Sequence, residues 1–147
     1  NPLPCVDRIT VHHEGGSAVW FTDAASSRSR LEAIRKGHLN RGWADIGYHY
    51  IIDRSGEIYE GRDVQYQGAH VRDHNERNLG IMVLGNFNEQ SPSSAQLAKL
   101  RTALQAFSAK YRVPVSRIHT HQELGRTSCP GRSLQSHMNW LRNGHLA

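Results

Sequence analysis

The segment LGIMVL (79–84) is an uninterrupted apolar run that follows a polar, loop-like stretch over residues 67–78. A run of this length is typical of a strand buried on both faces of a sheet. Both faces of such a strand need covering elements, and in α/β folds helices supply them. The segment therefore predicts a central strand, and the rest of the chain can be read outward from it.

Other segments predict the neighbouring strands of the sheet. DRITVH (7–12) alternates polar and apolar residues and is rich in β-branched side chains, which favours a strand. GYHYIID (47–53) reads as a strand that turns at residues 54–56 and returns over 57–60 as a hairpin. Residues 117–121 indicate a short late strand.

Helices are expected between and after these strands. Residues 26–40 place apolar positions on one helical face, with serines before the run and Gly42 after it. A second helix opens at residues 92–94 and carries leucines at helical spacing, and a third spans 133–143. The loop over residues 14–25 holds Trp20 and Phe21. Alternating strands and helices predict an α/β fold, a mixed sheet flanked by helices. The candidate metal ligands given below would place the metal site in a groove at the strand ends.

Length and composition indicate one domain. The chain has 147 residues, close to the rough size of about 150 residues per domain, and no repeat or linker divides it. We expect a single domain over residues 1–147 with its core at about 7–143, and a monomer. No apolar run approaches the ~20 residues of a membrane span, and no leader pattern predicts a signal peptide. The first residue is Asn1, so a processed chain or a piece of a longer protein is possible.

The charge balance is basic but not informative by itself. Eighteen Lys and Arg against 13 Asp and Glu give a net charge of +5, which favours polyanionic partners such as nucleic acid or anionic cell-wall polymer. The basic residues are scattered, and zinc-finger spacing, aromatic RNA-binding motifs and basic arms are absent from the sequence. The sequence therefore does not predict a nucleic-acid binder.

Histidine and cysteine point to a metal site. Ten histidines are many for this length, and His is the commonest metal ligand. Of the two cysteines, Cys129 lies eight residues after His121 in a loop. A Cys5–Cys129 disulfide, two buried thiols, and a thiolate ligand or nucleophile at Cys129 are the alternatives. Two imidazoles and a thiolate would suit zinc with one open position.

Spacing alone does not choose among the histidines. His12 and His13 are adjacent and would point to opposite faces of a strand, so we expect one of them at the site. His119 and His121 are two residues apart and would share a face of a strand, so both are candidates by periodicity.

Six blocks together resemble a known family. They occur in the family's order and spacing and cover residues 9–131: ITVHH (9–13), RGWADIGYHYIID (41–53), GEIYEGRD (56–63), QGAH (67–70), NLGIMVLGNF (78–87, with Asn75 before it) and HQELGRTSCPG (121–131). The chain is similar to the zinc-dependent N-acetylmuramoyl-L-alanine amidases of the phage-lysozyme-like and peptidoglycan-recognition-protein family. That resemblance implies cleavage of the amide between the lactyl group of N-acetylmuramic acid and L-alanine in peptidoglycan.

The resemblance also implies the site residues. The zinc ligands, for one ion per chain, would be His12, His121 and Cys129, and His119 has no ligand counterpart. The catalytic tyrosine would be Tyr48. Thr127 stands two residues before the cysteine, where some members have lysine and catalytic recognition proteins have threonine.

Four further residues are candidates for substrate binding. His70 and Asn75 match groove positions of the family. Trp20 could stack on a sugar ring, with a packing role equally open. Arg62 could pair with a carboxylate of the peptide stem, with a solvated surface role equally open.

The alternative function is a peptidoglycan-recognition module with little or no turnover, which the threonine at position 127 leaves open. The substrate implies an extracellular or periplasmic location. The preference for diaminopimelate or lysine stems is left open, because Asp63 and Val64 match neither pattern of the recognition proteins.

Overall fold

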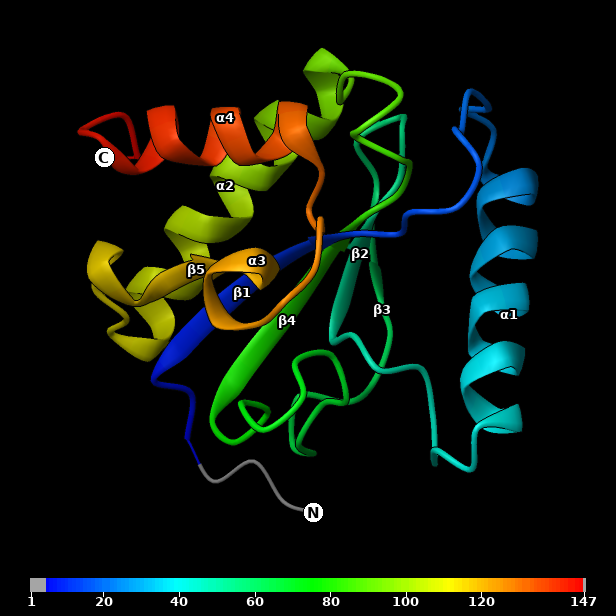
Figure 1. Ribbon diagram of the computed structural model, residues 1–147, viewed down its shortest axis with the longest axis horizontal. Coiled ribbons are helices and arrows are strands. Elements are labelled where there is room, and N and C mark those ends of the chain that lie inside the picture. Colours follow the sequence, from blue (N-terminus) through cyan, green and yellow to red (C-terminus); the bar gives the residue numbers. More distant parts are fainter. Residues whose placement is uncertain (1–4, 147) are drawn as a thin grey trace.

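The computed structural model describes residues 5–146, so only the outermost ends of the expected single domain lie outside it. Within those residues the strands form one five-stranded sheet in the order β3-β2-β4-β1-β5 (Figure 1). Its strands are β1 (Arg8–His13), β2 (Tyr50–Ile52), β3 (Ile58–Glu60), β4 (Asn78–Val83) and β5 (Ile118–Thr120). The four neighbours β2, β4, β1 and β5 pair in parallel, and β3 pairs antiparallel with β2. The expected mixed sheet is confirmed, with the apolar run at its centre.

Helices cover both faces of this sheet. They are α1 (Ala24–Asn40), α2 (Ser94–Tyr111), the short α3 (His121–Leu124) and α4 (Arg132–Arg142), with a 3-10 turn η1 (Val115–Arg117) before β5. Figure 1 shows α1 on one side of the sheet and α2 with α4 on the other. The arrangement is the α/β architecture that the sequence predicts.

Side-chain alternation along β1 divides its residues between the two faces. Ile9 and Val11 belong to the larger apolar cluster, which α2 and α4 complete. Thr10 and His12 therefore point to the opposite face. His12 pairs in register with Met82, which belongs to the smaller cluster beneath α1. His12 thus lies buried on the α1 side of the sheet.

The start of α1 differs from the prediction. The helix begins at Ala24 because Asp23, rather than a serine, caps it and accepts a hydrogen bond from the backbone of Ser26. Ser27 is buried instead and donates to Asp53 at 2.7 Å. The opening of α2 agrees with the sequence, since Ser93 forms a capping box.

Two strands are shorter than predicted. Residues 47–49 lie before β2. The carbonyl of Gly47 accepts from the backbone N–H of Ala69, and that of His49 accepts from Gly61, which directly follows β3. The late strand ends at Thr120, because Thr120 is the N-cap of α3 and forms a capping box with Glu123. His121 is therefore the first residue of a helix rather than the last of a strand.

Candidate metal centre and cleft

Three side chains from separate elements converge at the carboxyl ends of the parallel strands. His12 lies near the end of β1, His121 opens α3 directly after β5, and Cys129 lies in the loop after α3. One ligand atom from each lies within 4.8 Å of the others. His12 Nδ1 is 3.6 Å from Cys129 Sγ. The group is composed of the residues that the resemblance implies as ligands.

Backbone contacts hold the cysteine in place. The carbonyl of Cys129 accepts from the N–H of Gln122 at 2.9 Å, and its N–H donates to Thr127 Oγ1 at 3.2 Å. The N–H of His13 points at Cys129 Sγ from 3.4 Å. These contacts join the loop to both α3 and β1.

The neighbouring histidines, His13 and His119, lie outside the ligand group. His13 points away from the group, and its Nδ1 accepts from the N–H of Phe87 at 3.0 Å. This placement follows from alternation along a strand. His119 lies within β5 and is not part of the group. The prediction that His119 and His121 share a strand face is wrong, because His121 belongs to α3 and not to β5.

The donor set fits a metal ion of the zinc type. Two imidazoles and one thiolate match the ligands of catalytic zinc sites. His121 Nδ1 is buried without a hydrogen-bond partner, which is costly unless another group satisfies it. Burial, ahead of the repulsion from neighbouring histidines, lowers the pKa of His12 well below 6.5. A neutral imidazole with a free lone pair is the form that binds a metal.

Cys129 also has the environment of a ligand rather than of a free nucleophile. Burial raises the pKa of its thiol to about 12 despite the hydrogen bond from His13. A thiolate there needs a nearby positive charge, which a divalent cation would supply. Cys5 and Cys129 are both free, and Cys5 is exposed, so both the disulfide and the paired buried thiols are excluded in this structure.

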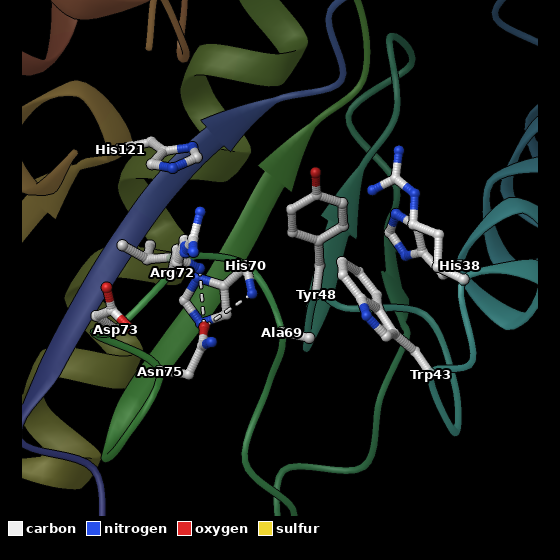
Figure 2. Close-up of a pocket in the computed structure, with 11 residues that line it drawn as sticks. His38, Trp43, Tyr48, Ala69, His70, Arg72, Asp73, Asn75 and His121 are labelled. Carbon is white, nitrogen blue, oxygen red and sulfur yellow. Dashed lines mark hydrogen bonds between the residues drawn. The ribbon is translucent and has the colours of Figure 1, made fainter. Parts of the chain in front are cut away.

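A cleft of about 500 Å³ opens beside this group (Figure 2). Aromatic, cationic and polar side chains line it: His38, Arg41, Trp43, Tyr48, Ala69, His70, Val71, Arg72, Asp73, Asn75 and His121. Because His121 belongs to both the cleft and the ligand group, a molecule in the cleft would lie next to the metal position.

Tyr48 stands at the junction of cleft and ligand group. Its ring centroid is 5.2 Å from that of His12. Burial, followed by the nearby Cys129 and Glu14, raises the pKa of its phenol. The hydroxyl therefore stays protonated near neutral pH and can donate a hydrogen bond, which agrees with an orienting role rather than that of a base.

The structure brings His70 and Asn75 into the cleft wall, although each is bonded within the protein. Asn75 Oδ1 accepts from the N–H groups of His70 and Val71, both at 2.8 Å, and so shapes the loop (Figure 2). The His70 ring is buried and contacts His12.

Thr127 and Arg62 lie in different surroundings. Thr127 is exposed beside the ligand group and bonds the N–H of Cys129. The guanidinium of Arg62 donates to the carbonyls of Ile46 at 2.9 Å, Gln67 at 2.8 Å and Asp45 at 3.0 Å. Arg62 thus ties two loops together.

Trp20 is not among the residues that line the cleft. Its side chain is 64% exposed, and the guanidinium of Arg54 lies 4.6 Å from its ring centroid. Trp20 therefore contacts Arg54 and does not line this cleft.

Sequence reasoning missed several cleft residues, namely His38, Arg41, Trp43, Arg72 and Asp73. The rings of Trp43 and His38 pack together in the cleft wall, with their centroids 4.7 Å apart. His38 Nδ1 accepts from the N–H of Gly47. The position of Arg41 and Trp43 in the same block as Tyr48 was the available signal.

The chain is similar to known proteins over most of its length. The profile of the N-acetylmuramoyl-L-alanine amidases (Amidase_2) matches residues 2–132. The chain belongs to this amidase family. The endolysin of Escherichia phage T7 is 34% identical, with 90% of each sequence covered. Peptidoglycan-recognition protein SC2 of Drosophila melanogaster is 33% identical, covering 90% of this chain and 72% of that protein.

A longer relative sets a limit on the comparison. The N-acetylmuramoyl-L-alanine amidase of Sus scrofa is 37% identical over 91% of this chain, but the match spans only 22% of the pig protein. The chain thus corresponds to about a fifth of that relative's length.

Solved structures share the fold. The amidase LysC of Clostridium intestinale superposes with a TM-score of 0.79 at 28% identity, over 94% of this chain and 85% of that one. Peptidoglycan recognition protein LE in complex with tracheal cytotoxin gives a TM-score of 0.85 at 27% identity, over 99% and 86%. Among residues 5–146, the helices include none with the length and apolarity that a membrane crossing requires.

Proposed function

We propose that this chain hydrolyses the amide between the lactyl group of N-acetylmuramic acid and L-alanine in peptidoglycan, using one zinc ion held by His12, His121 and Cys129. The observation that carries the proposal is the convergence of these three side chains at the edge of the cleft that Tyr48 lines. Family membership supports the same reaction, because the matching family model is that of the N-acetylmuramoyl-L-alanine amidases.

The reaction adds water across one amide bond. It yields a lactyl carboxylate and the free amine of L-alanine. Zinc, when bound, lowers the pKa of a coordinated water and polarises the carbonyl of the amide. The protein must hold the substrate beside the ligand group and stabilise the charge that develops on the carbonyl oxygen.

Two side chains beside the ligand group, Tyr48 and Thr127, can stabilise this charge. The protonated phenol of Tyr48 donates a hydrogen bond toward the developing oxyanion or the attacking water. Thr127 accepts from the N–H of Cys129, which leaves its own hydroxyl hydrogen free to serve as a second donor. Thr127 cannot supply the positive charge of a lysine, so its contribution is a hydrogen bond only.

The cleft accounts for substrate binding. His70 and Asn75 form part of its wall, and Trp43 offers an aromatic surface on which a sugar or a stem side chain can pack. Because peptidoglycan lies outside the cytoplasmic membrane, the proposed site of action is extracellular or periplasmic. We expect a monomer, since one chain contributes every proposed ligand.

The test combines metal analysis with product analysis. Elemental analysis of the purified protein should give about one zinc per chain. Incubation with purified peptidoglycan should release peptides that begin with L-alanine, a chelator should stop the release, and added zinc should restore it. Zinc without release, with retained binding to peptidoglycan, would replace the amidase by a recognition module. Release that continues without metal would overturn the zinc centre.

A further inference from the structure

A chain of hydrogen bonds runs from the backbone to the proposed ligand His12. His12 Nε2 lies 2.8 Å from His70 Nδ1, and His70 Nε2 lies 2.9 Å from the carbonyl oxygen of Asn78. Both contacts are buried. On the other side of its ring, His12 presents Nδ1 to Cys129 Sγ.

The direction of this chain is fixed at its backbone end. A carbonyl oxygen can only accept, so His70 must carry its proton on Nε2. In a neutral imidazole the other nitrogen, Nδ1, then has a lone pair and accepts from His12. His12 must therefore carry its own proton on Nε2, which leaves the lone pair on Nδ1 facing the ligand group.

The fold builds a place for the His70 ring. Gly80 pairs in register with Thr10 on the same face as His12. A Cβ on Gly80 would lie 2.7 Å from Cδ2 and 2.8 Å from Cγ of His70, so only glycine leaves room for the ring there.

The carbonyl that ends the chain is itself held. Asn78 is buried, its Oδ1 accepts from Thr10 at 2.8 Å, and its Nδ2 donates to the carbonyl of His74 at 2.8 Å. All the hydrogen bonds from His12 to Asn78 therefore lie within the packed sheet and not at a mobile surface.

We propose that His70 is a positioning residue, which holds His12 in the Nε2–H tautomer and directs its Nδ1 lone pair to the metal. The inference rests on the metal centre of the proposed function and adds a role to a residue that the sequence pointed to only as part of the substrate groove. Groups that hydrogen-bond a metal-binding histidine fix its tautomer and orientation, and their loss commonly costs about 10–100-fold in metal affinity.

The most direct test uses the metal-free protein and no substrate. Long-range proton–nitrogen NMR of the 15N-labelled protein distinguishes the two tautomers of each histidine. We expect both His12 and His70 to carry the proton on Nε2. A His12 ring with its proton on Nδ1 in the wild-type protein would overturn the proposal without any mutation.

Variants of His70 then test the consequence for the metal. His70→Phe keeps a ring of similar size but removes the acceptor, and we expect zinc affinity, measured by competition with a chelator, to fall about 10–100-fold. His70→Asn keeps an acceptor near the position of Nδ1, so its loss should be smaller. His119→Phe, on β5 of the same sheet but outside the ligand group, is the matched control and should bind zinc as the wild type does.

Three outcomes separate the explanations. Zinc affinity of His70→Phe within twofold of the wild type, in a variant with a native circular dichroism spectrum, would overturn the proposal. If His70→Phe does not fold, the tautomer in the wild type and the affinity of His70→Asn still decide. If the wild type binds zinc with the expected tautomers but releases no peptide, the amidase function fails while the role of His70 stands.

Discussion

The two faces of the central sheet bury different kinds of side chain. On the face beneath α2 and α4, Ile9, Val11 and Leu79 pack with helix leucines in one apolar cluster. On the face beneath α1, the same strands bury Thr10 and His12. Buried polar groups contribute little net stability but require fixed partners. The comparison indicates that the face beneath α2 and α4 carries the larger apolar cluster, while the face beneath α1 buries the ligand His12 beside a smaller one.

The largest effect should come from removing a ligand of the proposed metal centre. Cys129→Ala should reduce bound zinc to well below one per chain and lower peptide release by more than the 10–100-fold that is typical of outer contacts of a metal site. Elemental analysis and the peptidoglycan assay measure both. Cys5→Ala, which alters the other free and exposed cysteine, is the control and should change neither. Full zinc content and activity in Cys129→Ala would show that the ligand set is wrong.

A substitution on the face beneath α2 and α4 should lower the stability while leaving the bound zinc and the specific activity unchanged. Leu104 is fully buried in the larger cluster, so Leu104→Ala should lower the free energy of unfolding by about 2–5 kcal/mol in urea titrations. The folded fraction should keep its zinc and its specific activity. Leu39→Ala, at a helix position that is 37% exposed, should cost about 0.5 kcal/mol or less. If Leu104→Ala loses zinc while still folded, the two faces are coupled and the comparison fails.

The pH dependence of stability tests the contacts of Glu123 in α3, the helix that begins directly after β5. Burial raises the pKa of Glu123, but hydrogen bonds from Arg142, Gln135 and Thr120 outweigh it and lower the pKa to about 2 from its ordinary 4.5. Its stabilisation is therefore complete above pH 4.5 and is lost as the pH falls toward 2. Because the side chain is 30% exposed, solvent screening reduces the contribution to about 1–2 kcal/mol.

Glu123→Gln should accordingly be less stable than the wild type by about 1–2 kcal/mol at pH 7, with the difference vanishing as the pH approaches 2. Urea titrations at several pH values measure it. Glu76→Gln, at an exposed position, is the control. A difference that stays constant with pH would mean that the charge of Glu123 is not what anchors α3.

The sequence predicted the sheet well because its signals are local. An apolar run, a β-branched alternation and leucines at helical spacing after residues 92–94 each indicate their own element, and β4, β1 and α2 follow them. The family resemblance is confirmed by the profile over residues 2–132. Within the site, the resemblance pointed to His12, His121 and Cys129, and the structure brings these three together.

What the sequence could not provide depends on contacts between distant residues. The bond between His12 and His70 joins positions 58 apart in the chain, and no periodicity reports it. The sequence left Arg62 open between a ligand of a stem carboxylate and a solvated surface role. Its bonds to loop carbonyls depend on positions that only the folded backbone defines. His121 was assigned to a strand because the capping box of Thr120 and Glu123, only four residues long, was not recognised.

The smallest effect is expected at Trp20, which belongs to neither the cleft nor the sheet faces. Its ring contacts the guanidinium of Arg54, and an exposed pair of this kind is worth about 0.5–1 kcal/mol. Trp20→Ala should therefore lower the stability by no more than this and leave KM for peptidoglycan fragments unchanged. Trp43→Ala, within the cleft, is the comparison variant and should raise KM. A several-fold rise in KM for Trp20→Ala would extend the substrate site beyond the cleft and restore the sugar-stacking role that the sequence left open.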